Sequence, residues 1–148
     1  MAVLTSNRRA SFDYEILETY EAGIALLGFE VKSVRAGRMN LAGSFAVIRN
    51  GEAWLLNADI PPYQAKNTPP GYEPTRSRRL LLKKAEIRKL IGHTAQKGLT
   101  LIPLRVYTKG PKIKVAIGFA RRKKKYDKRE QIREREDQRK IARALREA

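Results

Sequence analysis

Three segments of the chain alternate hydrophobic and polar side chains, a pattern typical of strands that bury one face. In residues 14–26 the apolar side chains fall mostly on every second position. Residues 99–108 and 112–119 are two further segments of this kind, joined by Lys109-Gly110-Pro111. We therefore predict three strands, the last two of which are consecutive in the chain.

A β-hairpin is predicted where two short apolar runs, 45–48 and 53–56, flank Asn50-Gly51. This dipeptide accepts the positive φ angles that a two-residue hairpin turn requires. With the alternating segments, these runs bring the expected number of strands to at least five.

Two helices are predicted from apolar side chains that recur every three or four residues. In the first, Leu27, Val31 and Val34 form one stripe, and Gly37 suits a left-handed C-cap. The second helix is expected over residues 83–97. Its apolar face consists of Ile87, Leu90, Ile91 and Ala95.

These elements predict a mainly β fold: a small antiparallel barrel of the oligonucleotide-binding (OB) type, with two or three packed helices. The body is expected to span residues 1–120, since the composition changes at Arg121. Residues 121–148 contain no glycine or proline and few apolar side chains. We expect this basic tail to be disordered in isolation and helical once bound to a polyanion.

The charge of the chain narrows the choice of partners. The 148 residues carry a formal charge of +17, which favours polyphosphates such as RNA, DNA or anionic lipid. The first 120 residues carry a net +10 and the tail a net +7, so body and tail are both basic.

Several classes of function are disfavoured. Without cysteine the chain cannot form a disulfide scaffold, a cysteine zinc site or a thiol nucleophile. It has one histidine, His93, and no nucleophile or phosphate-loop motif, so we expect no enzyme activity, cofactor or metal. The longest uncharged apolar stretch, 22–29, is far shorter than the ~20 residues of a membrane span. No secretory signal is visible, so we expect a cytoplasmic protein without membrane partners.

A long loop is predicted between the hairpin and the second helix, because five prolines fall within residues 61–74. Loops of this length are usually functional. Its two tyrosines, Tyr63 and Tyr72, either stack on unpaired bases or pack back onto the barrel.

Arginines beside this loop are candidates for RNA binding. Arg76, Arg78 and Arg79 follow it directly, and planar guanidinium groups bind phosphates and stack on bases. The next residues, Leu80-Leu81-Leu82, are expected to turn one leucine outward beside the arginines. A second basic segment, Asn7-Arg8-Arg9, lies near the N-terminus.

Five segments of the sequence together carry a family resemblance. They are Asn7-Arg8-Arg9-Ala10, Glu21-Ala22-Gly23-Ile24, Gly28-Phe29-Glu30-Val31-Lys32-Ser33-Val34-Arg35-Ala36-Gly37, Pro74-Thr75-Arg76-Ser77-Arg78-Arg79-Leu80-Leu81-Leu82 and Tyr126-Asp127-Lys128-Arg129. In order and spacing the chain resembles, from about Asn7 to Leu145, the small protein B family of bacterial proteins, which bind transfer-messenger RNA (SsrA RNA).

The resemblance implies an RNA-binding adaptor in ribosome rescue. The body would bind the tRNA-like domain of transfer-messenger RNA at its elbow and D-loop, and would promote its charging by alanyl-tRNA synthetase and its delivery with elongation factor Tu. Residues expected on the RNA-facing side, from the resemblance and the basic segments together, are Asn7, Arg8, Arg9, Glu21, Arg76, Arg78, Arg79, Leu81 and Lys83.

The resemblance also implies a role for the tail on ribosomes stalled on truncated messages, where the chain would contact both subunits. The tail would enter the decoding centre and the empty mRNA channel of the small subunit and form a helix there. The tail residues expected at these sites are Lys123, Lys124, Lys125, Tyr126, Asp127, Lys128, Arg129, Ile132 and Arg133.

Three positions depart from the family pattern. Arg122 replaces a common glycine at the expected hinge, Arg79 replaces a common lysine, and Tyr126 stands where some members have histidine. A structural ribosomal protein with a basic tail is the alternative interpretation of the same charge pattern, and an RNA-processing nuclease is a third.

Overall fold

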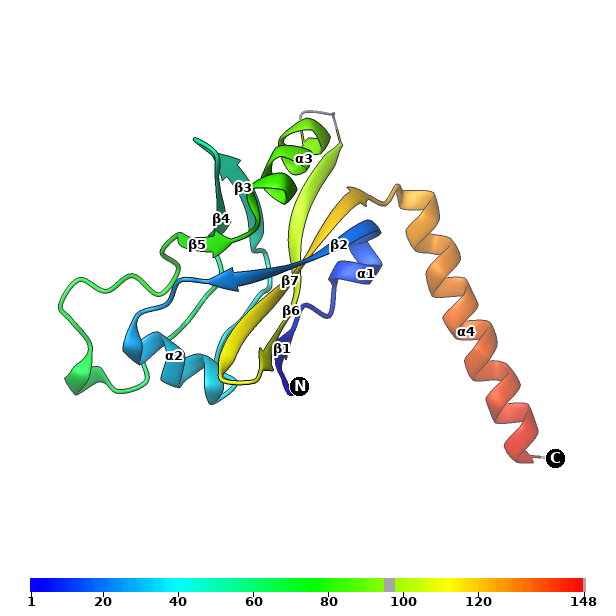
Figure 1. The fold of residues 1–148 in the computed structure, drawn as a ribbon. Coiled ribbons are helices and arrows are strands. Elements are labelled where there is room, and N and C mark those ends of the chain that lie inside the picture. The colour runs from blue at the N-terminus through cyan, green and yellow to red at the C-terminus, as the bar shows by residue number, and fades with distance from the viewer. Residues whose placement is uncertain (95–97, 148) are drawn as a thin grey trace.

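The computed structural model describes residues 1–94 and 98–147. In this part of the chain the strands are β1 (Val3–Ser6), β2 (Tyr14–Ile24), β3 (Phe45–Arg49), β4 (Glu52–Leu56), β5 (Arg78–Leu81), β6 (Leu99–Lys109) and β7 (Lys112–Arg122). The helices are α1 (Ala10–Asp13), α2 (Gly28–Arg35), the 3-10 helix η1 (Ala65–Asn67), α3 (Lys84–Thr94) and α4 (Lys125–Glu147). Figure 1 shows a strand-rich body from which α4 extends.

The strands form one antiparallel sheet in the order β1-β6-β3-β4-β5-β2-β7, and β6 also pairs with β7. That additional pairing closes all strands except β1 into a ring. β3 pairs with β6 at Leu101, and β1 pairs with β6 further along, from Arg105 to Tyr107. The ring is not evenly round, but it confirms the predicted mainly β fold with a small antiparallel OB-like barrel.

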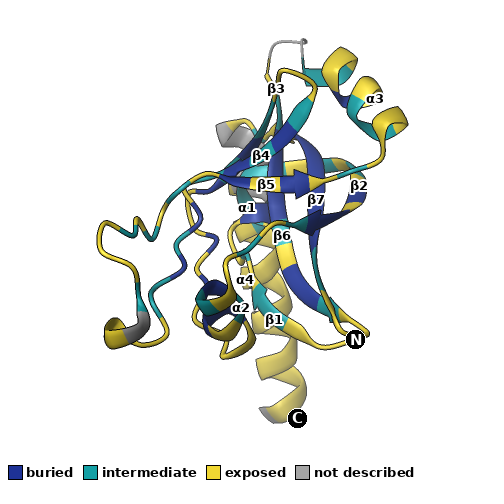
Figure 2. Ribbon diagram, turned by 60° about the vertical axis from the view of Figure 1, so that its left-hand side comes forward, coloured by how far each residue is buried: buried dark blue, intermediate teal, exposed yellow. Residues whose placement is uncertain are grey.

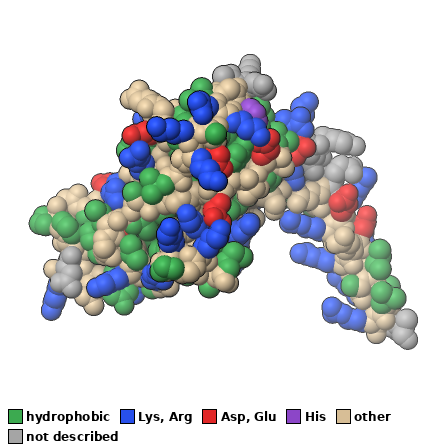
Figure 3. Space-filling view, viewed as in Figure 1, with side chains coloured by type: hydrophobic (Ala, Val, Ile, Leu, Met, Phe, Trp, Pro, Cys, Tyr) green, Lys and Arg blue, Asp and Glu red, His purple; other side chains and the backbone are tan. Residues whose placement is uncertain are grey.

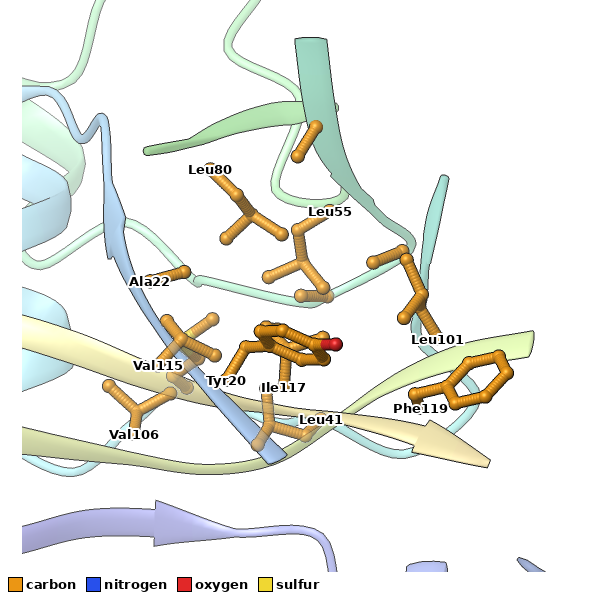
Figure 4. Close-up of a cluster of buried hydrophobic side chains, with 14 of the residues drawn as sticks. Tyr20, Ala22, Leu41, Leu55, Leu80, Leu101, Val106, Val115, Ile117 and Phe119 are labelled. Carbon is orange, nitrogen blue, oxygen red and sulfur yellow. The ribbon is translucent and has the colours of Figure 1, made fainter. Parts of the chain in front are cut away.

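The core of the ring contains the inward-facing apolar side chains of several strands. Figure 4 shows the side chains of Tyr20, Ala22, Leu55, Leu80, Leu101, Val115 and Ile117 gathered between the strands. Leu90 of α3 and Val34 of α2 belong to the same cluster and are fully buried, so each of these helices covers part of the barrel. Figure 2 shows that burial concentrates in the strands, whereas α4 is exposed over residues 132–146.

The elements predicted from long periodic segments are confirmed. Strands β2, β6 and β7 coincide with the three alternating segments, and β3 and β4 form the predicted hairpin with five residue pairs from Phe45↔Leu56 to Arg49↔Glu52. The turn residues have the required positive φ, 51° at Asn50 and 74° at Gly51. Gly37, with φ 77°, follows the end of α2.

Other elements differ from the prediction. β1, α1 and β5 each have four residues, too short for a periodic pattern to reveal them. β7 continues past the predicted end of the body, because Arg121 and Arg122 pair with Glu15 and Tyr14 of β2. The predicted helix at 83–97 corresponds to α3, and its last three positions, Ala95 included, lie outside the described residues.

In the structure the tail forms the helix α4 over residues 125–147, and its disorder in isolation stays a prediction. Two features explain why helix can form despite the charge. Arginine, lysine, glutamate and glutamine have high helix propensity, and the sequence spaces opposite charges four residues apart at Arg133/Asp137 and Glu136/Lys140. The helix points away from the barrel (Figure 1).

Among the described residues, the tail contacts the body near its base. The backbone N–H of Lys123 donates to the carbonyl of Asp13 at 2.8 Å, and Lys123 Nζ donates to the carbonyl of Ser11 at 2.7 Å and to Gln131 Oε1 at 2.8 Å. The guanidinium of Arg135 lies 5.9 Å from the ring centre of Phe12. Helix α1 is therefore the support on which the tail starts, next to the position of Arg122.

Candidate nucleic-acid interface

Strand β5 divides the basic segment after the loop between two faces of the sheet. Arg78 and Leu80 point inward and are buried, whereas Arg79 and Leu81 point outward and are exposed. The side chain of Arg78 is 0% exposed, so the prediction that it faces RNA is corrected. Side chains of a strand alternate between faces, and Arg78 lies on the core side of that alternation.

The partner of Arg78 is Glu30, a buried carboxylate whose role the sequence did not reveal. Arg78 Nη2 lies 2.6 Å from Glu30 Oε2, and Arg76 Nη2 lies 2.5 Å from Glu30 Oε1. Arg78 also donates to the carbonyls of Ala58, Pro74 and Arg76. The pair therefore connects helix α2 to both ends of the proline-rich loop and holds that loop against the barrel.

The two loop tyrosines behave differently. Tyr72 packs back onto the body: its hydroxyl donates to Glu30 Oε2 or the carbonyl of Ile60, at 2.9 and 2.8 Å, and its ring meets Phe29 edge-on at 4.7 Å. Tyr63 is 38% exposed, and the guanidinium of Arg38 lies 5.3 Å from its ring centre. Of the two loop tyrosines, Tyr63 is therefore the one whose ring is accessible to a ligand.

Acid should destabilise the body through Glu30. Burial by itself would raise the pKa of Glu30, but hydrogen bonds from Arg76, the Leu27 N–H, Arg78 and Tyr72 lower it to about 2. Because the pKa is lower in the folded state than its ordinary 4.5, the stabilisation is complete above pH 4.5 and is lost as the pH falls toward 2. The difference corresponds to about 3 kcal/mol.

This pH dependence can be measured by urea unfolding of the full chain between pH 7 and pH 3. The free energy of unfolding is expected to fall below pH 4.5 more steeply in the unmodified chain than in Glu30→Gln, because glutamine does not titrate. Equal slopes in the two proteins would show that Glu30 does not carry the effect.

On the outer face, Glu21 is held by two neighbours on β6. Tyr107 donates its hydroxyl to Glu21 Oε2 at 2.5 Å, and Lys109 donates to Oε1 at 3.0 Å. These hydrogen bonds lower the pKa of Glu21. Burial and the hydrogen bond to Glu21 raise the pKa of Tyr107 to about 12. Glu21 is thus an ionised acceptor that fixes the position of a lysine and a tyrosine.

Beside Glu21 lies a groove of about 350 Å³ between β5, β2 and the β6–β7 turn. Leu81, 51% exposed, forms one wall above Gly23, where an added Cβ would come within 3.2 Å of Leu81 Cβ. The cationic side of the groove is lined by Arg35, Lys112 and Lys114. An apolar wall opposite a basic rim can take a sugar or base on one side and phosphate on the other.

Two further residues that are predicted to face RNA, Arg79 and Lys83, lie on or next to β5. Arg79 is exposed and forms an ion pair with Glu52 at 3.3 Å. Lys83 is exposed, and its backbone N–H donates to Glu86 Oε1 at the start of α3. The structure therefore brings together four predicted residues on one side of the barrel, which we call the β2–β5 face. They are Glu21, Arg79, Leu81 and Lys83, whereas the fifth predicted residue of this region, Arg76, pairs with Glu30.

The N-terminal basic segment lies elsewhere, next to the base of the tail. Asn7 is fixed by hydrogen bonds to the carbonyls of Pro103 and Leu104, at 3.0 and 2.8 Å. Arg9 pairs with Asp13 at 3.5 Å and lies 5.0 Å from the ring centre of Phe12. Arg8 and Arg9 are exposed, so this segment offers a second basic surface beside α1.

The predicted ribosome-binding residues lie at the base and first turns of α4. Lys124, Arg129 and Arg133 are exposed, Ile132 is 44% exposed, and Lys123 is partly buried by its contacts with α1. The side chains of Lys125, Tyr126, Asp127 and Lys128 lie outside the described part of the structure. Figure 3 shows lysine and arginine side chains over the body and along α4.

Two other kinds of site were sought in the described part of the chain. No group of three or more histidine, aspartate and glutamate side chains there could hold a metal ion. No described helix is long and apolar enough to cross a membrane.

The chain is similar to known proteins over almost its whole length. The family model described as "SmpB protein" matches residues 4–147. The SsrA-binding protein of Thermosynechococcus vestitus is 54% identical over 98% of this chain and 95% of that protein. The SsrA-binding protein of Gloeothece citriformis is 56% identical over 97% of this chain and 92% of that protein.

A solved structure has the same fold as this chain. It is described as "tmRNA-SmpB: a journey to the center of the bacterial ribosome", and its matching chain is 53% identical with a TM-score of 0.67. The match covers 82% of this chain and 85% of the other. With the family model matching residues 4–147, these similarities show that the chain belongs to the SmpB protein family.

Proposed function

We propose that this chain binds transfer-messenger RNA and acts with it in trans-translation, the rescue of ribosomes stalled on truncated messages. The observation that carries the proposal is the basic groove beside Leu81 on the β2–β5 face, in a chain more than half identical to proteins named SsrA-binding protein. The net charge of +17 supplies the attraction to RNA over the whole molecule.

In this proposal the β2–β5 face binds the tRNA-like domain at its elbow and D-loop. A rigid strand surface with an apolar wall and a cationic rim suits recognition of a folded RNA by shape, sugar and phosphate rather than by base sequence. Glu21 repels phosphate, so its function is to position Lys109 and Tyr107 and to accept hydrogen bonds from a 2′-hydroxyl or a base edge.

The tail acts separately from the body. Helix α4 leaves the barrel beside α1 and extends away from the strands (Figure 1). On the ribosome, it enters the decoding centre and the mRNA channel of the small subunit, where a message already present excludes it sterically. Recognition of a stalled ribosome then depends on an mRNA channel that holds no message. The body of the chain lies between the two ribosomal subunits.

Two further partners, alanyl-tRNA synthetase and elongation factor Tu, follow from the likeness of the bound RNA to a tRNA. The bound RNA is a better substrate for alanyl-tRNA synthetase and travels with elongation factor Tu, so the chain contacts these proteins indirectly. All of these partners lie in the cytoplasm, which is where we place the chain.

Replacing Glu21 by alanine is expected to weaken binding of the tRNA-like domain about 3- to 10-fold, because one or two positioned hydrogen bonds are lost. A gel-shift titration measures the affinity, and urea unfolding checks that the barrel is intact. The matched control is Glu15→Ala, which removes a carboxylate paired with Arg121 at the other end of the same strand. Equal affinities for the two variants would remove Glu21 from the interface.

A further inference from the structure

The single tryptophan of the chain, Trp54, lies on the outer side of strand β4. Its neighbours Ala53 and Leu55 point into the core with exposures of 1% and 0%, whereas Trp54 is only partly buried. Across the sheet, Trp54 pairs with Val47 of β3 on one side and with Arg79 of β5 on the other. An amphipathic ring thus lies beside an exposed arginine on the surface of the barrel.

A hollow of about 300 Å³ opens beside this ring. Trp54 and Leu56 give it an apolar wall, and Arg49, Asn50 and Ser77 give it polar groups. The volume is at the lower end of the range that small-molecule sites occupy, so a planar ring system fits it. The backbone at Asn50 is fixed by the hairpin turn, and this places the amide and the exposed Arg49 at one end of the hollow.

These groups have the chemistry of a nucleotide site. An aromatic face stacks on a base, a guanidinium binds phosphate, and an amide and a hydroxyl can donate to or accept from base edges. The hollow lies next to the β2–β5 face, since Trp54 pairs across the sheet with Arg79, an outward residue of β5. The exposed Arg49 in the lining of the hollow favours an anionic partner over an apolar protein segment.

We infer that this hollow receives an unpaired nucleotide of transfer-messenger RNA, with its base stacked on Trp54 and its phosphate beside Arg49. The inference rests on the proposed function and extends the interface from β2 and β5 to the hairpin of β3 and β4. In this arrangement the β2–β5 face binds the folded surface of the RNA, and the hollow binds one unpaired nucleotide that projects from the folded RNA.

Because Trp54 is the only tryptophan, its fluorescence reports directly on the site. Adding transcribed tRNA-like domain to the full chain is expected to quench the emission in parallel with binding, which a gel shift of labelled RNA measures independently. In the double variant Trp54→Phe/Val3→Trp, the single tryptophan is moved to an exposed position of β1, outside the proposed interface, and the same titration is expected to leave its emission nearly unchanged.

Substitution at Trp54 tests the contribution of stacking to affinity. Trp54→Leu keeps an apolar side chain but loses the ring, and is expected to weaken binding about 5- to 100-fold. Trp54→Phe keeps a ring and is expected to stay near the unmodified affinity. Urea unfolding checks that each variant is folded. If Trp54→Leu does not fold, the quenching experiment on the unmodified chain tests whether Trp54 contacts the RNA.

The outcomes separate this inference from the proposed function. RNA that binds tightly without quenching Trp54, and equally well to Trp54→Leu, overturns the stacking site and leaves the proposed function standing. Quenching by ribosomal subunits but not by the tRNA-like domain also overturns it, since the nucleotide would then belong to another RNA. If the tRNA-like domain does not bind at all, the proposed function itself is wrong.

Discussion

Removing residues 125–148 is expected to abolish tagging on stalled ribosomes while leaving binding of the tRNA-like domain within about threefold at physiological salt. The reason is that the tail and the proposed RNA-binding face lie on different parts of the structure. In the described part of the chain, the tail contacts the body at α1, whereas the proposed RNA-binding face lies on β2 and β5. The cut belongs after Lys124, because β7 runs to Arg122 and Lys123 is hydrogen-bonded to α1.

Two assays on the same protein test this prediction. A gel shift measures affinity for the tRNA-like domain, and a reconstituted translation reaction on a message without a stop codon measures the tag. The matched control is a full-length chain whose residues 125–148 are shuffled, which keeps the charge but not the sequence. Normal tagging by the truncated chain would contradict the proposed role of the tail, and normal tagging by the shuffled chain would reduce that role to charge alone.

Replacing Glu30 by glutamine is expected to destabilise the body by about 3–5 kcal/mol, because Arg78 would remain buried without a charged partner. Arg78 has no exposed surface, so it cannot reach water without opening the loop. For a chain of this length, the loss corresponds to a melting temperature lower by roughly 10 °C. The free energy of urea unfolding measures the effect.

The matched control is Glu52→Gln, which breaks the exposed pair with Arg79 and is expected to cost less than about 1 kcal/mol. The double variant Glu30→Met/Arg78→Met removes both buried charges and is expected to regain part of the stability lost in Glu30→Gln. A Glu30→Gln chain as stable as the Glu52→Gln chain would show that the buried pair does not hold the loop.

Long periodic segments were predictable because each buries one face of an element over many residues. The alternation in β2, β6 and β7 and the Asn50-Gly51 turn contain enough information to fix these elements without knowledge of their partners. The closed ring depends on pairings between distant segments, such as the single Ala46↔Leu101 pair of β3 with β6, and no local pattern contains them.

The correction at Arg78 has the same origin. β5 has four residues, too few for the alternation of its side chains to show in the sequence, and the sequence alone therefore predicts all three arginines on one surface. Its buried partner did leave a signal: Glu30 lies three residues after Leu27 and four before Val34, on the apolar stripe of α2. That position predicts a buried carboxylate, but only the fold shows that Arg76 and Arg78 neutralise it.

The tail shows where sequence analysis reaches its limit. Its composition favours helix, whereas its net charge favours an extended chain, and the balance of these two effects is small for an isolated helix. The structure has a helix that starts on α1, through contacts of Lys123 and Arg135 that a charge count cannot anticipate. Arg122, the last residue of β7, pairs with Tyr14 of β2 just before this support.

The central claim is that this chain holds one particular folded RNA, and purifying the tagged full-length chain from its own cells and sequencing the bound RNA tests it most directly. The measurement is made in parallel with Glu21→Ala, which is expected to retain less of the same RNA. We predict strong enrichment of transfer-messenger RNA over ribosomal RNA and tRNA. Ribosomal RNA recovered in equal amounts of both subunits, without transfer-messenger RNA, would contradict the account and identify a structural ribosomal protein.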